Sequence, residues 1–270
     1  METEEQASKP SFNCILFDLD ETLYPLSSGL SAATTESINR YMVEKLNIEE
    51  TKVHDLCIPL YKQYGTTMAG LRALGYKFDY ADYHSFVLGS LPYSNLKPDP
   101  VLRNLLLTLP IRKLIFTNAD EAHTQRVLTR LGLNDCFEGV ICFETLNEKR
   151  KGDEEVEADE RIRDDSGHHL PKTPVICKPS EEAFNAAFQI AKIDPHKTVF
   201  VDDSLRNLQA GKKLGLCTIR VGSSCQDEGV DHALESIHNI KGALPHLWEG
   251  NGKPECINQE TVAIETTVRA

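Results

Sequence analysis

The chain has 270 residues, enough for one large domain or for a core domain with a smaller insertion. Its hydrophobic fraction of 40% is ordinary for a globular protein with a packed core. The formal net charge of -12, without a large cluster of Lys and Arg, argues against a general nucleic-acid binder and against electrostatic binding to membrane surfaces.

The cysteines and the N-terminal segment indicate the environment of the protein. None of the eight cysteines forms a Cys-x-x-Cys pair, and several lie in apolar runs, which favours reduced, buried thiols over disulfides or a zinc site. Residues 1–10 are polar and acidic, unlike a secretory signal. No apolar run approaches the roughly 18 residues of a membrane helix. We expect a cytoplasmic location, with a nuclear one not excluded, and no nucleic-acid or membrane partner; the oligomeric state stays open.

Short, continuous apolar runs predict buried strands of a parallel sheet. They lie at residues 14–17, 113–116, 198–201 and 217–221, with 140–142 as a further candidate. Helical periodicity lies between them, at 121–131, 180–191 and 204–214. A last helical pattern, 231–248, is expected to dock on the core. The alternation of strands and helices predicts an α/β fold with a doubly wound, Rossmann-like parallel sheet.

One long helical stretch, residues 25–97, interrupts this alternation. It is too long for a single crossover helix, which predicts an inserted helical cap domain. Its expected helices are 35–46, 52–65, 66–74 and 80–88. Gly65 and Gly70 lie within this pattern at a cost of about 1 kcal/mol each relative to Ala, which indicates a helix boundary close to the core or to a substrate.

These patterns divide the chain into expected domains. The catalytic core is predicted to consist of 11–24 and 98–248, with the cap at 25–97 between its two parts. Residues 147–173 carry many charges and few apolar side chains, which predicts an acidic mobile loop. Loose tails are expected at 1–10 and 249–270.

Polar residues follow three of the predicted strands at the point where each strand ends. In chain order they are Asp18, Asp20, Thr117, Asn118, Asp202 and Asp203. The carboxyl ends of parallel strands meet at one edge of a sheet, where such folds carry their active sites. We therefore expect these side chains to share a site.

The charged residues of this group indicate metal and phosphate chemistry. Asp18 and Asp20 would lie on the same side of an extended chain, where two carboxylates repel each other unless a cation or a proton lies between them. The adjacent Asp202 and Asp203 suit a hard cation such as Mg²⁺. Lys178, just before a predicted helix, could offset the charge of a phosphate.

A purely structural role competes with this interpretation for each motif alone. Lys178 by itself is more often a solvated lysine, and the Asp18–Asp20 motif is short. However, the order Asp-x-Asp-x-Thr, Thr, Lys-Pro, Asp-Asp places each signal at the expected position of a βα alternation. The combination favours a catalytic site.

The same motifs resemble the haloacid dehalogenase-type (HAD) hydrolase superfamily over residues 12–221. They are FDLDETL at 17–23, FTN at 116–118, KP at 178–179 and VDDSLRN at 201–207. The resemblance implies a HAD core with an inserted C1-type cap and a requirement for Mg²⁺. It implies that Asp18 is the nucleophile and a metal ligand. Asp20 would be the acid and base, and would also ligate the metal through its backbone carbonyl.

The resemblance assigns roles to the other residues as well. It implies that Asp203 is the third protein ligand of the metal and that Asp202 is a direct or water-mediated ligand. Thr117 and Asn118 would bind the phosphoryl group. Lys178 would neutralise that group and steady the nucleophile.

Two positions refine this expectation. The dehalogenases that named the superfamily lack a carboxylate two residues after the nucleophile, so Asp20 favours phosphoryl transfer through an aspartyl-phosphate. Asn207 stands where many relatives carry an aspartate, which puts the usual contact between lysine and that aspartate in doubt.

The inserted segment resembles the caps of the plant and fungal pyrimidine 5′-nucleotidase-like branch through YKQYGTT at 61–67, followed by Gly70 and Leu71. Outside the insertion, DLDETLYP at 18–25 and VFVDDSLRNL at 199–208 resemble the same branch. The resemblance implies a nucleoside 5′-monophosphate as the small phosphorylated substrate, with Tyr64 and Thr67 as substrate-binding residues. Helix packing is the competing role for the tyrosines of this segment. Three other functions stay open: a phosphatase of another small metabolite, such as a sugar phosphate, a phosphomutase, and a regulatory protein that uses the fold without catalysis.

Overall fold

The computed structural model describes residues 11–147, 161–163 and 169–248 of the chain. The expected tails, 1–10 and 249–270, lie outside this part, and so does most of the acidic loop expected at 147–173. Within that stretch, β4 (Arg161–Arg163) and β5 (His169–Pro171) pair as a two-stranded antiparallel sheet. No helix in the described part of the chain has the length and apolar character needed to cross a membrane.

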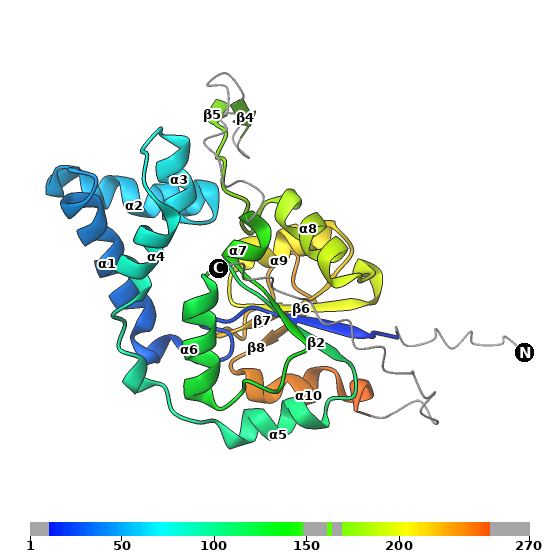
Figure 1. Ribbon diagram of the computed structural model, residues 1–270. Helices are drawn as coiled ribbons and strands as arrows, with labels where there is room; N and C mark the ends of the chain where they lie inside the picture. Colours follow the sequence, from blue (N-terminus) through cyan, green and yellow to red (C-terminus); the bar gives the residue numbers. More distant parts are fainter. Residues whose placement is uncertain (1–10, 148–160, 164–168, 249–270) are drawn as a thin grey trace, which may run out of the picture.

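The main sheet has six strands, all of them parallel (Figure 1). They are β1 (Cys14–Phe17), β2 (Arg112–Phe116), β3 (Gly139–Ile141), β6 (Thr198–Asp202), β7 (Cys217–Val221) and β8 (His232–Leu234). Their order across the sheet is β3-β2-β1-β6-β7-β8. The predicted α/β fold with a parallel, Rossmann-like sheet is therefore confirmed. Every residue of β1 and β6 is buried, as continuous apolar runs predict for central strands.

Helices cover both faces of the sheet because alternate residues of each strand point to opposite sides. On one face, Ile15 and Phe17 pack in a cluster with α5 (Pro100–Thr108) and α6 (Glu121–Leu131). On the other face, Cys14 and Leu16 pack with α8 (Glu181–Ala191) and α9 (Leu205–Lys213). The short helix α7 (Phe143–Asn147) follows β3. Figure 1 shows the sheet between these two layers.

Four helices between β1 and α5 form a helical insertion that stands to one side of the sheet (Figure 1). They are α1 (Leu30–Glu44), α2 (Glu50–Tyr64), α3 (Thr67–Ala73) and α4 (Tyr80–Leu88). The insertion has an apolar and aromatic cluster of its own, which also takes in Phe143, Val175 and Cys177 from outside it.

Gly65 marks a point of close approach between the insertion and the core. It ends α2 with a φ of 86°, and a Cβ at this position would lie 2.0 Å from the carbonyl oxygen of Lys178. The prediction that a helix boundary at Gly65 lies close to the core is confirmed. Gly70 has a different reason: a Cβ there would lie 2.6 Å from Cβ of Leu60, so it allows α3 to pack against α2.

The prediction of a helix over 231–248 is wrong. This segment contains β8, two 3-10 turns, Ile237–Asn239 and Pro245–Leu247, and the short helix α10 (Ile240–Ala243). Its apolar residues do dock on the core, as expected, because Ile237, Ile240 and Leu244 are buried there. Ser236 caps the first 3-10 turn and Pro245 begins the second, and these two residues interrupt a spacing that periodicity alone assigns to one helix.

Candidate active site

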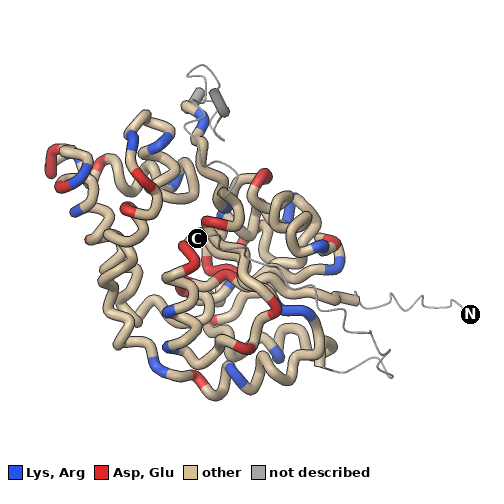
Figure 2. The backbone as a smooth tube through the Cα atoms, in the orientation of Figure 1, with Lys and Arg blue, Asp and Glu red and all other residues tan. Residues whose placement is uncertain are grey.

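The carboxyl ends of β1, β2 and β6 bring the predicted site residues to one edge of the sheet. Phe17 pairs with Ile115 of β2 and with Val201 of β6. Asp18, the residue that follows β1, therefore lies beside Asp202, the last residue of β6. Figure 2 shows Asp and Glu residues clustered near the middle of the view, between the sheet and the helical insertion.

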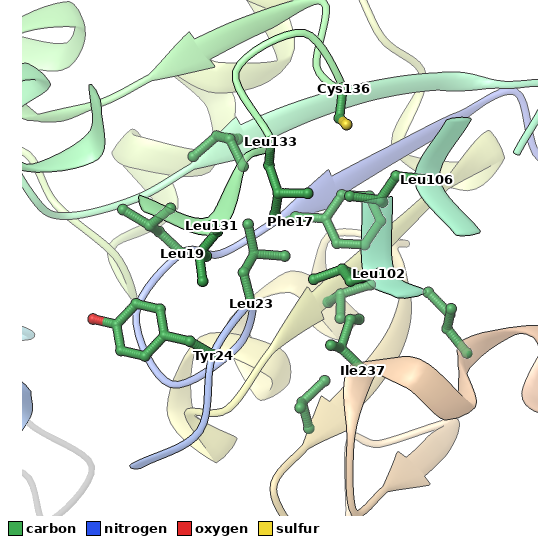
Figure 3. Packing of buried hydrophobic residues seen from close by; sticks show 14 of the residues in the cluster. Phe17, Leu19, Leu23, Tyr24, Leu102, Leu106, Leu131, Leu133, Cys136 and Ile237 are labelled. Carbon is green, nitrogen blue, oxygen red and sulfur yellow. The ribbon is translucent and has the colours of Figure 1, made fainter. Parts of the chain in front are cut away.

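The loop after β1 is anchored by apolar side chains on one side, so that its carboxylates face the other. Leu19 and Leu23 are buried in the same cluster as Phe17 (Figure 3). The amide N–H of Asp18 donates to the carbonyl of Val201 at 2.8 Å, which continues the sheet by one bond. Alternation along the chain then turns Asp18 and its second neighbour, Asp20, away from the apolar cluster.

Lys178 makes hydrogen bonds at the carboxyl ends of all three strands. Its ammonium donates to Asp18 Oδ1 at 2.7 Å, to Asp202 Oδ2 at 2.8 Å and to the carbonyl of Phe116 at 2.7 Å. The side chain is 1% exposed, and all three of its donor hydrogens have a partner. Burial opposes the charged form, but the two carboxylates outweigh it and raise the pKa of Lys178. The geometry and the raised pKa thus both favour the charged form of this lysine at the carboxyl edge of the sheet.

Asp202 is held in place by four hydrogen bonds. Besides Lys178, it accepts from the amide N–H of Ser204 at 2.8 Å and from Asn207 Nδ2, which lies 3.1 Å from both of its oxygens. Asn207 thus bonds to Asp202. The second carboxylate that accepts from Lys178, besides Asp18, is that of Asp202 and not one at position 207. The sequence left the contact between Lys178 and a carboxylate of this motif in doubt. The pairing of β1 with β6 places Asp202 where it makes that contact.

Three carboxylates at this edge have the composition and spacing of a cation site. Ligand oxygens of Asp18, Asp202 and Asp203 all lie within 4.8 Å of one another. Burial raises the pKa of Asp18 to about 7, against the lowering effect of Lys178, and burial with the neighbouring carboxylates raises the pKa of Asp203 to about 9. One ammonium does not balance three carboxylates, so the cluster fits a hard divalent cation bound through oxygen.

Thr117 and Asn118 lie at the end of β2, next to Lys178. The hydroxyl of Thr117 is buried and accepts from the amide N–H of Ala119 at 3.0 Å. The side chain of Asn118 makes a reciprocal pair with the backbone of Lys178, donating to its carbonyl at 3.0 Å and accepting from its N–H at 2.8 Å. In this arrangement Asn118 positions the lysine segment.

Asp20 has partners that the sequence did not reveal. Its Oδ1 accepts from the Tyr24 hydroxyl and lies 2.7 Å from His123 Nε2. Burial works against ionisation, but the His123 ring and the Tyr24 hydroxyl outweigh it and lower the pKa of Asp20. Tyr24, four residues after Asp20, could have been found from its spacing within the loop. His123 lies 103 positions away, and only the fold brings it to Asp20.

The structure does not bring Tyr64 and Thr67 to this cluster. The Tyr64 hydroxyl donates to the carbonyl of Pro171 at 3.0 Å. The Thr67 hydroxyl donates to the carbonyl of Cys57 at 3.2 Å, inside the insertion. Both side chains are buried, so the observed contacts of these two residues are packing contacts.

Two curated relatives match most of the chain. Phosphate metabolism protein 8 of Saccharomyces cerevisiae is 26% identical over 216 residues, which cover 77% of this chain and 60% of the yeast protein. Glyceraldehyde 3-phosphate phosphatase of Methanocaldococcus jannaschii is 22% identical over 252 residues, which cover 86% of this chain and 97% of that protein. The match to the yeast protein therefore spans less than two thirds of its length.

Solved structures with low sequence identity have the same fold. CbbY from Rhodobacter sphaeroides, in complex with phosphate, has a TM-score of 0.54 at 16% identity, over 85% of this chain and 96% of that one. YfnB from Bacillus subtilis, bound to magnesium, has a TM-score of 0.52 at 18% identity, over 87% and 99%. L-2-haloacid dehalogenase from Xanthobacter autotrophicus has a TM-score of 0.51 at 15% identity, over 89% and 99%.

A family model gives the relationship directly. The model for haloacid dehalogenase-like hydrolases matches residues 12–215. This range includes Asp18, Lys178 and Asp202, together with the whole helical insertion. The chain belongs to the haloacid dehalogenase-like hydrolase family.

Proposed function

We propose that this protein is a Mg²⁺-dependent phosphatase of small phosphomonoesters, with Asp18 as the nucleophile. The observation that carries the proposal is the buried Lys178 ammonium, which bonds to Asp18 and Asp202 beside the third carboxylate, Asp203. A phosphoryl group is the kind of anion that such a combination of carboxylates, ammonium and cation binds. Asp20, which is two residues after the nucleophile, favours phosphoryl transfer over dehalogenation, because only the phosphate ester has an alcohol leaving group that needs a proton.

The residues that would hold Mg²⁺ are Asp18, Asp202 and Asp203, with the backbone carbonyl of Asp20. When bound there, the cation supplies positive charge that offsets the charge of the phosphoryl oxygens. It would also favour the ionised forms of carboxylates whose pKa values are raised in its absence, including that of Asp203.

The reaction that this geometry supports has two displacement steps. In the first, a carboxylate oxygen of Asp18 forms a bond to phosphorus, the bond from phosphorus to the ester oxygen breaks, and Asp20 donates its proton to the leaving alcohol. In the second, water attacks the phosphorus of the aspartyl-phosphate and transfers a proton to Asp20. The bond from Asp18 to phosphorus breaks, inorganic phosphate leaves, and both carboxyl groups return to their starting states.

Three further residues would act on the phosphoryl group. Thr117 and Asn118 would contact its oxygens from the end of β2, the latter through its backbone while its side chain holds Lys178 in place. Lys178 would neutralise part of the phosphoryl charge and keep Asp18 oriented for attack, since it already bonds to one oxygen of that carboxylate.

For the substrate we propose a nucleoside 5′-monophosphate, preferably of a pyrimidine, selected by residues 25–97 acting as a cap over the strand ends. The support is the resemblance of this segment to nucleotidase caps. Tyr64 and Thr67 would contribute to selection by shaping the packed interior of the cap, since their hydroxyls bond to backbone carbonyls. A sugar phosphate is the second candidate, because one relative is named a glyceraldehyde 3-phosphate phosphatase.

Phosphate release from a panel of esters tests the proposal. The panel contains UMP, CMP, AMP and several sugar phosphates, each assayed with Mg²⁺ and with EDTA. We expect hydrolysis with Mg²⁺, reversible loss of activity with EDTA, and a kcat lower by at least about 10³-fold for Asp18→Asn. Thermal unfolding of the variant provides the control for its fold.

Different outcomes contradict different parts of the proposal. Full activity of Asp18→Asn, or of the wild type in EDTA, would remove the proposed chemistry. Similar rates for all esters would remove the nucleotide preference and leave the chemistry standing. Absence of phosphate release from every ester by the folded wild type would favour the non-catalytic alternative.

A further inference from the structure

Asp20 is held through one of its two oxygens. Both the Tyr24 hydroxyl and His123 Nε2 bond to Oδ1, whereas the side chain as a whole is 37% exposed. Oδ2 receives no hydrogen bond from the described residues and is the oxygen that a leaving group could meet. The direction of Oδ2 therefore depends on what fixes Oδ1.

His123 continues this contact into the interior of the protein. Its side chain is 2% exposed, in the first turn of α6, and its Nδ1 lies 2.7 Å from the Tyr93 hydroxyl. That hydroxyl donates its single proton to the carbonyl of Leu88 at 2.7 Å. It must then accept from His123, so Nδ1 carries a hydrogen, and Nε2 donates a second hydrogen to Asp20. Burial opposes the charged ring, but the Asp20 carboxylate outweighs it and raises the pKa of His123. Each member of the chain fixes the orientation of the next.

The far end of this chain lies on the connection between the helical insertion and the core. Leu88 is the last residue of α4, and Tyr93 begins the 3-10 turn Tyr93–Asn95 that precedes α5. Arg126, one turn after His123 on α6, holds the same connection: it donates to the carbonyl of Gly89 at 2.9 Å and lies 5.6 Å over the Tyr93 ring. Helix α6 therefore holds this connection with two side chains, and only one of them contacts Asp20.

We propose that His123 and Tyr93 are positioning residues for Asp20, and that the chain from Leu88 through Tyr93 and His123 links the orientation of its carboxyl group to the connection of the helical insertion. This inference rests on the proposed function, in which Asp20 protonates the leaving alcohol and then activates water. The side-chain hydrogen bonds of His123 are with Tyr93 and Asp20, and the proposed function gives it no role in binding phosphate or metal. It acts through Asp20 alone.

The proposal has a consequence that a general loss of stability does not have. Protonation by Asp20 matters most for an alkyl ester, whose alkoxide is a poor leaving group, and least for p-nitrophenyl phosphate, whose phenolate leaves without help. Hydrolysis of the aspartyl-phosphate needs Asp20 as a base whatever the ester was. Misplacing Asp20 should therefore slow phosphoryl transfer to Asp18 mainly for the alkyl ester. It should slow hydrolysis of the aspartyl-phosphate whichever ester was used.

The experiment compares single-turnover and steady-state rates of UMP, or of the best alkyl ester in the panel above, with those of p-nitrophenyl phosphate, all with saturating Mg²⁺. For His123→Ala we expect phosphoryl transfer from the alkyl ester to slow by roughly 10²-fold and transfer from p-nitrophenyl phosphate by less than about 5-fold. A burst of about one equivalent of p-nitrophenolate should then precede slow turnover. His123→Gln keeps a donor near the position of Nε2 and should recover part of the alkyl-ester rate.

Two more variants separate positioning from folding. Tyr93→Phe keeps the ring and removes one hydroxyl, and we expect the same selectivity for the alkyl ester at about 3- to 10-fold. Arg126→Ala loosens the same connection without touching Asp20 and should change the rates of both esters alike. If His123→Ala does not fold, as its melting temperature would show, the Gln and Phe variants decide the question.

The outcomes separate this inference from the function on which it rests. A wild type that hydrolyses neither ester removes the proposed function, and the inference with it. An active wild type whose folded His123 and Tyr93 variants slow single-turnover phosphoryl transfer from both esters equally, or leave both transfer rates unchanged, overturns the inference alone. Selective loss for the alkyl ester, with a burst from p-nitrophenyl phosphate, supports it.

Discussion

The catalytic edge of the sheet and the helical insertion bury polar groups in different ways. At the edge, Lys178 and Asp202 are almost fully buried and carry opposite charges, and every partner of the lysine lies within 2.8 Å. In the insertion, buried hydroxyls such as that of Thr67 bond to backbone carbonyls, and aromatic rings such as Tyr41 and Tyr83 fill the interior. One region depends on a charge network and the other on packing.

The difference predicts how each region responds to substitution. Removing one member of a buried charge network leaves its partners buried without an opposite charge, which lowers the stability of the protein strongly at any position of the network. Removing one side chain from an apolar cluster costs less on average, and the cost depends on how far the neighbours relax. Substitutions at the edge should therefore have large effects, and substitutions on the insertion should have graded ones.

The largest effect should come from Lys178→Met, which keeps the length of the side chain and removes its charge. Asp18 and Asp202 would be left without their ammonium, so we expect the free energy of unfolding to fall by about 3–5 kcal/mol and phosphatase activity to disappear. Urea denaturation without Mg²⁺ measures the first effect. The matched control is Lys113→Met: Lys113 is only partly buried and donates to the carbonyls of Leu109 and Ile111, so its loss should cost about 1 kcal/mol.

Equal losses of stability for the two lysine variants would contradict the contrast between charge network and packing. They would mean that the carboxylates next to Lys178 are stable without it. In that case protonation of Asp18 and Asp203, whose pKa values are raised to about 7 and about 9, would relieve the repulsion between the carboxylates without the lysine.

The sequence predicted which residues lie at the carboxyl edge of the sheet better than it predicted the contacts between them. Apolar runs that end in Asp18 and Asp202 locate two strand ends, and parallel pairing places them side by side. The sequence does not show which carboxylates bond to the Lys178 ammonium. That depends on where the segment around Lys178 passes the carboxyl ends of the strands, which only the fold determines. The contact between His123 and Asp20 was likewise out of reach, since it needs the packing of α6 against the loop after β1.

In the insertion, the sequence predicted most of the helices well but not where their side chains point. Three of its helices were predicted to within two residues at each end, and α4 begins and ends at the expected positions, whereas α1 begins at Leu30 and not at the expected residue 35. The direction of its side chains was not predicted, because helical spacing assigns a residue to a face without saying what that face meets. Tyr64 and Thr67 show this: both lie on expected helices, yet their hydroxyls bond to carbonyls within the packed structure.

An intermediate effect should come from Gly65→Ala, at the point where the insertion meets the lysine segment. Both Gly65 and Gly75 have a φ of 86°, so an alanine costs about 1–2 kcal/mol at either position through the backbone alone. Only at Gly65 would the added Cβ meet an obstacle, the Lys178 carbonyl at 2.0 Å; at Gly75 there is nothing within 4 Å. We expect Gly65→Ala to lose about 2 kcal/mol more than Gly75→Ala.

The pair of glycine variants also separates stability from catalysis. Moving the Lys178 carbonyl would disturb its bond with Asn118, so Gly65→Ala should lower kcat, whereas Gly75→Ala should leave kcat unchanged. Unfolding and phosphate release measured on both variants provide the comparison. Equal effects would show that backbone strain alone matters and that the close approach is tolerated.

The smallest effect should come from Arg206, which joins the two regions at the surface. Its guanidinium donates to the carbonyls of Tyr61 and Lys62 at the end of α2 and lies 4.6 Å over the Tyr61 ring. The carbonyls in the last turn of a helix lie at the negative end of its dipole and attract a cation, so this contact favours the arrangement in which the insertion lies against α9. It is exposed, and solvent weakens it. Arg206→Gln should therefore change the melting temperature little.

The effect of Arg206→Gln should appear in substrate binding. If the insertion must lie against the core to bind a phosphomonoester, a smaller population of that arrangement weakens apparent binding in proportion. We expect KM to rise about 3- to 10-fold and kcat to stay within about 2-fold of the wild type. The control is Arg40→Gln, since Arg40 pairs with Glu44 on its own helix and lies over the Phe86 ring, both of them within the insertion. A lower kcat with unchanged KM would instead place Arg206 in the chemistry of the neighbouring carboxylates, and the two regions would then be less separate than their interiors indicate.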